Sequence, residues 1–380
     1  MSKPIISVNG SSTMNIRNKI AVVLLAYADF ESLEIALAAH TKFLPEDVHL
    51  FILQNGRGNY DCERTYSVAK RYEYLFARNV KVVDWIAPQA PYYAIRALLN
   101  SEMMQEFDYI CKVDDDVFPL QSDWLDRLCE CYEVSHEKYG DSLAYVTSLV
   151  NNNSFGFAEL ITRSYLKDEY FDKIARLPIE HMPYCEEAGI FRYEFDSKWD
   201  AIWRLPYISR WLHSKTTLNP EHYIDITKKL PDVEFNAKER YSINCMIFRK
   251  QYWNDIFMGD SDDEYSSQMY CKENNKKIVV RLSVPFVHLF FFTQRDENKD
   301  LLPLIRECYQ NWLDLPFPVS LCPLKEYENE NRLRFLEKQM SRKKESLLEH
   351  IFSLKNRGDH KVITICGIKI KINRKKSPKE

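Results

Sequence analysis

The sequence predicts an α/β domain built on a mostly parallel sheet with helices on its faces. Hydrophobic residues make up 45% and charged residues 28% of the 380 residues, a balance that is typical of globular proteins. Short, continuous apolar runs suit strands that are buried on both faces, and they alternate with stretches of helical periodicity. Polar residues follow three of these runs directly. Because ligands bind beyond the carboxyl ends of strands in such sheets, these positions are the first candidates for a site.

The first strand is expected at Ile20–Tyr27, where the sequence reads IAVVLLAY. Asp29 is a candidate N-cap for a helix through the next residues, because apolar side chains recur there at helical spacing. Further strands are expected at Val48–Leu53, Val80–Ile86, Tyr109–Val113 and Leu143–Val150, and a further helix at Tyr93–Met104.

Periodicity is weak between residues 152 and 240, where aromatic residues and proline recur, so we expect an insert of loops and helices folded over the sheet. After it, we expect a strand at Cys245–Phe248, a helix that ends near Asn274, a strand at Ile278–Leu282 and an apolar segment at Val287–Phe292. A long charged helix is expected at Leu324–Asn356. The last element is a hairpin at 362–372 that turns near Cys366–Gly367. These elements divide the chain into a polar extension at 1–17, an α/β domain at 18–300 and a helical and basic region at 301–380.

Charge is distributed unevenly, although the net charge is only −3. Residues 331–380 carry +10, and residues 1–330 carry −13. An acidic body argues against nucleic acid as a ligand, and the basic tail suits either an anionic membrane surface or a solvated helix. The ten cysteines form no C-x-x-C pair, and no run of about 18 apolar residues occurs, which indicates free thiols and no membrane span. A cytoplasmic location is therefore expected, and contact of the tail with the inner face of the membrane stays open beside the solvated helix. Self-association is left open.

Three consecutive aspartates, Asp114, Asp115 and Asp116, follow the strand expected at Tyr109–Val113. Adjacent carboxylates repel one another, so a bound cation is the expected compensation. Mg²⁺ and Mn²⁺ take carboxylate oxygens, often with substrate phosphates in the remaining positions. Since Asp114 and Asp116 share one side of an extended segment, one can bind metal while the other reaches sugar hydroxyls. The alternative is an acidic turn before the helix near Trp124–Leu128.

A second acidic cluster, GDSDDE at 259–264, precedes a predicted helix. Asp262, Asp263 and Glu264 are candidates for a general base that deprotonates a hydroxyl as it attacks an anomeric carbon. The alternative is that these acids cap the helix. His288 lies in an apolar strand, where it is either a satisfied core residue or a third metal ligand or diphosphate contact beside Asp116.

The order of these motifs resembles that of GT-A glycosyltransferases. The counterparts are IAVVLLAY at 20–27, KVDDDVF at 112–118, GDSDDE at 259–264 and PFVHLFFFTQR at 285–295. The last two, and the terminal VITICGIKIKI, are similar to segments of bacterial cell-surface polysaccharide glycosyltransferases. The likeness spans about residues 18–297. It implies a Rossmann-like GT-A fold, with a nucleotide-sugar half at 18–151, an acceptor or lid insert at 152–240 and an acceptor half at 241–300.

The resemblance also implies a reaction and its residues. A sugar would pass from a nucleotide-sugar, most often a UDP-sugar, to a glycan or lipid-linked glycan, with inversion and with Mn²⁺ or Mg²⁺ bound. The implied metal ligands are Asp116, Asp114 and His288. Asp263 matches the base, but the usual Glu-Asp pair is Asp-Asp here, so Asp262 and Glu264 stay open as alternatives. The implied nucleotide-sugar contacts are Ala26, Tyr27, Asp29, Asn55, Arg96, Lys112, Asp114 and Asp115.

Two other classes of protein have related sequence features. Haloacid-dehalogenase-like phosphohydrolases also place a D-x-D motif after an apolar strand. That motif normally ends the first strand, and it has Thr or Val where this chain has Phe118. A carbohydrate-binding or scaffold protein would bind sugar without metal-dependent nucleotide binding. The order of the motifs favours the glycosyltransferase over both.

Overall fold

The computed structural model describes residues 16–85, 89–164, 166–170, 172, 206–235, 243–256, 263–289, 298–314, 352–357, 360–365 and 368–373. The chain divides into two compact units, Met1–Phe317 and Pro318–Glu380. Each is described by itself.

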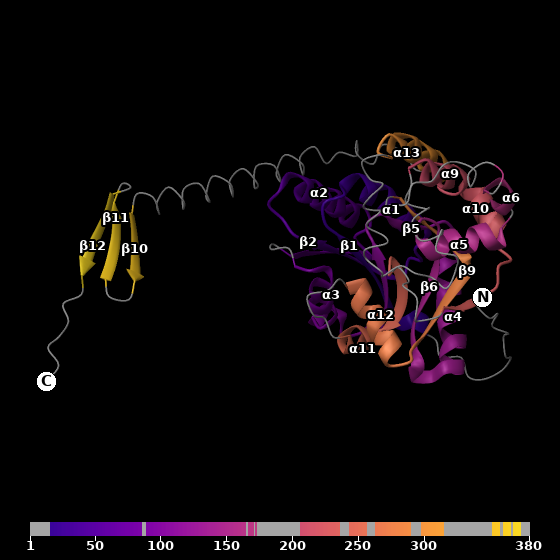
Figure 1. Cartoon of the computed structure of the whole chain (residues 1–380), viewed down its shortest axis with the longest axis horizontal. Coiled ribbons are helices and arrows are strands. Elements are labelled where there is room, and N and C mark those ends of the chain that lie inside the picture. The colour runs from indigo at the N-terminus through magenta and orange to yellow at the C-terminus, as the bar shows by residue number, and fades with distance from the viewer. Residues whose placement is uncertain are drawn as a thin grey trace. The chain divides into compact units, whose positions relative to one another are not determined.

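The first unit is built on a nine-stranded sheet (Figure 1) in the order β3-β2-β1-β4-β8-β6-β9-β5, with β7 paired to β9. The strands are β1 (Ile20–Ala26), β2 (His49–Asn55), β3 (Val80–Trp85), β4 (Tyr109–Asp114), β5 (Val117–Pro119), β6 (Leu143–Val150), β7 (Val233–Phe235), β8 (Cys245–Arg249) and β9 (Lys277–His288). β8 is antiparallel to both β4 and β6, so β6 and β9 run in the same direction as β1 to β4. The predicted mixed, mostly parallel sheet is therefore confirmed.

Helices flank the sheet (Figure 1), as expected for strands that are buried on both faces. The α-helices are α1 (Phe30–Phe43), α2 (Tyr60–Leu75), α3 (Pro91–Leu99), α4 (Trp124–Tyr139), α5 (Ser154–Arg163), α6 (Leu166–Glu169), α9 (Pro206–Lys215), α10 (Pro220–Thr227), α11 (Lys250–Asp255), α12 (Asp263–Glu273) and α13 (Leu301–Trp312). α1 begins where the sequence predicts, because the Asp29 carboxylate accepts a hydrogen bond of 3.3 Å from the Ser32 amide. None of the described helices has the length and apolar content to cross a bilayer.

The sheet differs from the prediction around Pro285. Two separate segments were expected there, yet β9 is one strand from Lys277 to His288. The β6–β9 pairing shifts register at this point: Ser148 pairs with Arg281, and the next residue, Leu149, pairs with Pro285. Such an irregularity lets a strand continue past a proline, which has no N–H to donate.

Two short strands were missed. β5 follows the aspartate triplet directly, and β7 lies inside the segment that was expected to be an insert of loops and helices. Both strands pair antiparallel with β9. Three residues are too few for a periodicity signal, so only the pairing reveals these strands.

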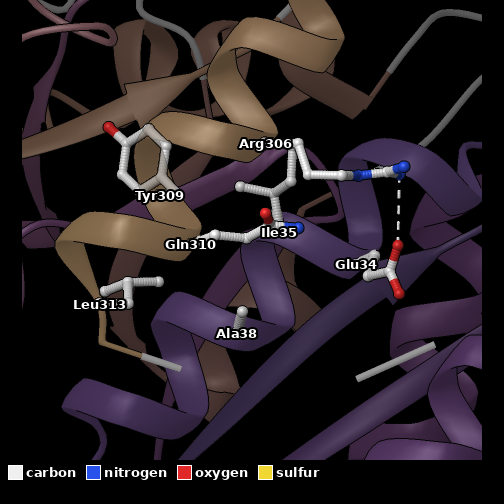
Figure 2. A pocket seen from close by; sticks show the side chains of 7 residues that line it. All are labelled: Glu34, Ile35, Ala38, Arg306, Tyr309, Gln310 and Leu313. Carbon is white, nitrogen blue, oxygen red and sulfur yellow. Dashed lines mark ion pairs between the residues drawn. The ribbon is translucent and has the colours of Figure 1, made fainter. Parts of the chain in front are cut away.

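α13 packs against α1 and belongs to the first unit, which therefore extends past the boundary expected at residue 300. Figure 2 shows the contact: Arg306 Nη2 lies 3.2 Å from Glu34 Oε2 across a cavity of about 10 Å³. This is near the smallest volume that holds one water molecule. Tyr309 of α13 meets Phe118 of β5 with ring centroids 5.0 Å apart, so α13 also covers β5.

The second unit contains a three-stranded antiparallel sheet of β10 (Phe352–Arg357), β11 (His360–Ile365) and β12 (Ile368–Asn373). The hairpin expected at 362–372 is confirmed. Its expected turn residues, Cys366 and Gly367, lie outside the described residues. The long helix expected at Leu324–Asn356 is wrong for residues 352–356, which belong to β10, and the rest of it lies outside the described residues.

Gly156→Ala is expected to lower the free energy of unfolding by about 3 kcal/mol. A Cβ at Gly156 would stand 1.7 Å from the carbonyl oxygen of Val150, so the start of α5 would have to move. Gly140→Ala is the control, because nothing lies within 4 Å of its Cβ and only the positive φ of 53° opposes the change. It should cost less, about 1–2 kcal/mol. Urea denaturation measures both, and equal losses would contradict the steric argument.

His40 gives the fold a pH dependence. It is fully buried in α1, its Nε2–H donates to the Val117 carbonyl at 2.9 Å, and burial lowers its pKa to about 4. Between about pH 6.5 and pH 4 the unfolded chain binds a proton that the folded chain does not, so stability falls as the pH falls through this window. The loss attributable to His40 should approach about 3 kcal/mol. His40→Gln keeps a donor for Val117 without titrating. Urea unfolding at several pH values should therefore show a shallower slope for this variant, and an unchanged slope would contradict the assignment.

Candidate active site

The site is built where β4, β5 and β9 meet. The aspartate triplet connects β4 to β5, and β5 pairs antiparallel with the end of β9, with Val117 opposite His288. This pairing brings together two buried side chains from distant parts of the sequence: His288 Nε2 lies 3.2 Å from Asp116 Oδ2. The sequence predicts both residues as metal ligands, and the structure places them in contact.

The ring of His288 is held in one orientation. Its Nδ1 lies 3.1 Å from the backbone carbonyl oxygen of Asn152, which can only accept, so Nδ1 carries the hydrogen. Nε2 therefore faces Asp116. Burial is the largest influence on the His288 pKa and lowers it, but the charge and hydrogen bond of Asp116 outweigh burial, so the pKa is raised overall. A histidine whose second ring nitrogen donates to a carbonyl is the usual arrangement for a metal ligand.

Asp115 joins the ends of β4 and β1. Its Oδ2 accepts a hydrogen bond of 3.1 Å from the backbone N–H of Tyr27. Asp115 is half-buried. Burial, followed by the charges of Asp116 and Asp29, raises its pKa well above the usual range. The carboxylates of Asp29, Asp115 and Asp116 thus lie at one end of the sheet, where a cation would relieve their repulsion.

Asp114 is held by the protein. It accepts hydrogen bonds from Lys112 Nζ and, at 2.9 Å, from Asn244 Nδ2. Lys112 is only 2% exposed, and its ammonium also donates to the Ile243 carbonyl at 2.9 Å. The structure therefore gives Asp114 a fixed orientation beside Asp116, with an internal counter-ion that sequence reasoning had assigned to the nucleotide-sugar.

The start of α12 lies within electrostatic reach of Lys112. Burial has the largest effect on the Lys112 pKa and lowers it, but Asp114, Asp263 and Glu264 together raise it overall. Asp263 begins α12, and its Oδ1 accepts from the Glu264 amide at 3.0 Å. Two of the three predicted base candidates are therefore close to the aspartate triplet, and the third, Asp262, lies outside the described residues.

The ends of β1 and β2 form another part of the site. Ala26 is buried, whereas the Tyr27 side chain is 47% exposed at the end of β1. Gln54 Nε2 donates to the Tyr27 carbonyl at 3.0 Å and fixes that backbone. Asn55 donates to the Gln89 carbonyl at 2.7 Å and accepts from the Gln89 amide at 2.9 Å. Asn55 thus orders the segment after β3, and Tyr27 offers an exposed ring.

The structure does not bring Arg96 into this group. Its guanidinium donates to the backbone carbonyl of Asn254, and it lies over the Tyr92 ring at 5.4 Å. These contacts join α3 to α11. The predicted contact of Arg96 with a nucleotide-sugar stays a prediction, and the structure shows its guanidinium bonded to α11.

Sequence reasoning missed the three asparagines that follow β6. Asn151 Oδ1 accepts from the His288 backbone N–H at 2.9 Å, Asn152 holds the ring of His288, and Asn153 caps α5 through the Gly156 amide at 2.6 Å. The sequence feature that could have found them is the string NNN at 151–153, directly after the fully buried strand β6. It resembles the aspartate triplet, which also follows a buried strand.

No protein family and no curated sequence matches the chain. Among solved structures, it is similar to GalNAc-T7 with UDP, GalNAc and Mn²⁺, with a TM-score of 0.40 and 10% identity over 93% of this chain and 67% of that one. It is similar to a mannosyltransferase from Pyrobaculum calidifontis in complex with GDP-Man and Mn²⁺, with a TM-score of 0.29 and 13% identity over 38% of this chain and 39% of that one. It is also similar to the bifunctional glycosyltransferase WbbM, with a TM-score of 0.34 and 9% identity over 86% of this chain and 54% of that one.

Two of these three proteins are named as a mannosyltransferase and a glycosyltransferase, the class that the motifs resemble. This chain spans between 39% and 67% of their lengths. Similarity at these TM-scores is too weak to assign an activity, so the chemistry must come from the site itself.

Proposed function

We propose that this chain is a metal-dependent glycosyltransferase of the GT-A class. It would transfer a sugar from a nucleotide-sugar to a hydroxyl of an acceptor. The observation that carries the proposal is the pair of Asp116 and His288, whose oxygen and nitrogen stand 3.2 Å apart at the carboxyl end of the sheet. The carbonyl of Asn152 holds the ring through Nδ1, so that Nε2 faces the carboxylate of Asp116.

The residues present fit a divalent cation that shares its coordination with substrate. Within the described residues, no group of three or more His, Cys, Asp or Glu side chains could hold a metal. Asp116 and His288 would therefore supply two ligands, and diphosphate oxygens and water would complete the shell of Mn²⁺ or Mg²⁺. Such an ion stabilises negative charge on a leaving diphosphate.

The remaining residues of the site bind and orient the donor. Asp114 is held by Lys112 and Asn244 and is partly exposed, so its free lone pairs are available to a sugar hydroxyl. The exposed ring of Tyr27 offers a flat surface for a nucleobase. Asp115 and Gln54 both bind the backbone of Tyr27 and so set the position of that ring.

Asp263 is the proposed general base. The helix that it begins holds its carboxylate at the edge of the site, and the Lys112 ammonium interacts with it favourably. A carboxylate so placed can take the proton of an acceptor hydroxyl as its oxygen attacks the far side of the anomeric carbon, which would invert the configuration. Glu264 is the alternative within the described residues, and Asp262 is the alternative outside them.

The finer features of the proposal rest on the resemblance of the motifs alone. They are a UDP-sugar donor, a glycan or lipid-linked glycan acceptor in cell-surface polysaccharide synthesis, and peripheral membrane contact through the basic tail. Arg96 and Asn55 stay predicted donor contacts, and their side chains also hydrogen-bond to the backbone of Asn254 and of Gln89.

Thermal unfolding tests the proposal. The melting temperature should be measured with UDP, GDP, CMP and dTDP in turn, each with Mn²⁺ and with EDTA. A ligand at 100 times its Kd stabilises the folded state by about 2.7 kcal/mol, so one nucleotide should raise the melting temperature when Mn²⁺ is present and not with EDTA. Absence of any metal-dependent shift would refute a metal–diphosphate site. Phosphate release from a simple phosphomonoester under the same conditions would point to a phosphohydrolase instead.

A further inference from the structure

We propose that Asn151 is a positioning residue for the metal ligand His288, and that it ties this ligand to helix α9. The inference rests on the proposed function. It adds a residue that neither contacts the metal nor touches substrate, and it assigns a role to the buried polar cluster that joins the end of β6 to α9. The cluster consists of Asn151, Asn152, His213, Thr216 and Thr217, all of which are buried.

Asn151 directly follows β6 and continues the hydrogen-bond pattern between β6 and β9. Its backbone N–H donates to the Phe286 carbonyl at 3.2 Å, as a further rung of the ladder would. The next donor on β9 is the N–H of His288, and the side-chain Oδ1 of Asn151 accepts from it at 2.9 Å. The nearby backbone carbonyl of Asn152 is thereby left for the ring Nδ1 of His288. One asparagine thus fixes the backbone of His288 while its neighbour fixes the ring.

The other end of the Asn151 amide is bound to Thr216 and Thr217, the two residues that directly follow α9. Its Nδ2 donates to Thr216 Oγ1 at 2.8 Å and to Thr217 Oγ1 at 3.1 Å. The hydroxyl of Thr216 donates in turn to the Leu212 carbonyl at 2.7 Å, so its lone pairs face Asn151. Both hydrogens on Nδ2 of Asn151 are therefore used. The orientation that points Oδ1 at His288 is the one that pairs both polar atoms of the Asn151 side chain.

Thr217 extends the contact to a second histidine. Its Oγ1 lies 2.8 Å from His213 Nδ1, and His213 Nε2 lies 3.3 Å from the side-chain amide of Asn152. These bonds join the two asparagines on one side to α9 on the other. A shift of α9 would therefore be passed to the backbone and the ring of His288 together.

The consequence concerns metal affinity. Loss of a group that orients a metal-binding histidine lowers metal affinity by about 10- to 100-fold. Asn151→Ala removes the acceptor of the His288 N–H together with both donors to α9. Thr216→Val is milder, because it keeps Asn151 and the shape of the threonine and removes one acceptor.

Thr227 provides the matched control. Like Thr216, it is fully buried at the end of a helix, and its hydroxyl donates to the carbonyl four residues earlier, that of Tyr223, at 2.8 Å. Its side-chain hydroxyl bonds the Tyr223 and Ile224 carbonyls, both within α10. Thr227→Val therefore reproduces the loss of a buried hydroxyl without the link to His288, and Thr216→Ser tests whether restoring the hydroxyl restores binding.

The experiment is a titration of the folded, full-length chain with Mn²⁺, in which electron paramagnetic resonance measures the bound ion. The titration is repeated in the presence of UDP and of GDP. Urea denaturation of each variant measures its stability. We expect Asn151→Ala to raise the Kd for Mn²⁺ about tenfold or more and Thr216→Val to raise it several-fold. Thr216→Ser and Thr227→Val should bind as the wild type does, although Thr227→Val should lose about as much stability as Thr216→Val.

Three outcomes would overturn the inference in distinguishable ways. If Asn151→Ala and Thr216→Val bind Mn²⁺ as tightly as the wild type, the cluster only supports the fold and the proposed function stands. If Thr227→Val weakens Mn²⁺ binding as much as Thr216→Val, the effect is one of general stability. If the wild type itself binds no Mn²⁺, the proposed function fails together with the inference. If Asn151→Ala does not fold, the comparison of Mn²⁺ binding by Thr216→Val and by Thr227→Val tests the inference.

Discussion

Asp116→Asn is expected to reduce sugar transfer by about a thousandfold or more. A divalent ion contributes several kcal/mol to the stabilisation of developing charge, and each 1.36 kcal/mol corresponds to a factor of ten in rate. The neutral amide is a poor ligand for Mn²⁺ or Mg²⁺ but has the same shape, so the buried contact with His288 is kept. The measurements are turnover with the nucleotide-sugar identified by thermal unfolding, and the Mn²⁺-dependent rise in melting temperature.

Stability should separate this effect from damage to the fold. Asp116 raises the pKa of Asp115 through its charge, so removing that charge relieves a repulsion. Asp116 also raises the pKa of His288 against the larger effect of burial, so the comparison belongs at a pH at which His288 is neutral in both proteins. There the free energy of unfolding of Asp116→Asn should stay level or increase while activity is lost. Asp141→Asn is the control: it makes the same chemical change at a side chain that is 94% exposed, and it should change neither quantity. A variant at Asp116 that keeps its metal-dependent nucleotide binding would show that the metal lies elsewhere.

The part of the site that could be predicted is the part that local sequence encodes. An apolar run such as Ile20–Tyr27 has few other uses than a buried strand, and the parallel arrangement puts the residues after each strand at one edge of the sheet. Asp29 and the aspartate triplet could be placed there because the position depends only on where the strands end.

The contacts that complete the site depend on pairings between distant segments. Nothing near Lys112 in sequence indicates that it is a buried counter-ion, because its partners Ile243 and Asn244 come from the segment beside β8. Asparagines such as Asn151 are common in turns, so the string after β6 reads as an ordinary loop until β9 is in place. His288 could be named as a ligand only from the resemblance, since its approach to Asp116 depends on the three-residue strand β5.

Arg96 illustrates a different limit of the sequence-based prediction. A motif position carried over from a family specifies where a helix runs, but it does not specify how a long side chain is used. α11 packs against α3 here and supplies the Asn254 carbonyl, so the guanidinium has a backbone partner within the protein. If the proposed metal site is correct, the cation held by Asp116 and His288 would supply positive charge beside the diphosphate.

Asp263→Asn is expected to lower kcat by about a hundred- to ten-thousandfold, the usual contribution of a positioned general base. Donor binding should be unchanged, because the metal pair and the Tyr27 surface do not involve α12. The effect should therefore fall on kcat with little change in the KM for the nucleotide-sugar. The amide can still accept from the Glu264 N–H, which preserves the start of the helix.

Glu264→Gln is the matched variant, since it removes a charge that acts on the same Lys112 from the next residue. If Asp263 is the base, Glu264→Gln should keep most of its turnover. The reverse result would move the role to Glu264, and full turnover in both would leave Asp262 as the acid to test. The anomeric configuration of the product, read by NMR, provides the independent check: a base at the start of α12 requires inversion, and retention would mean that none of these acids has that role.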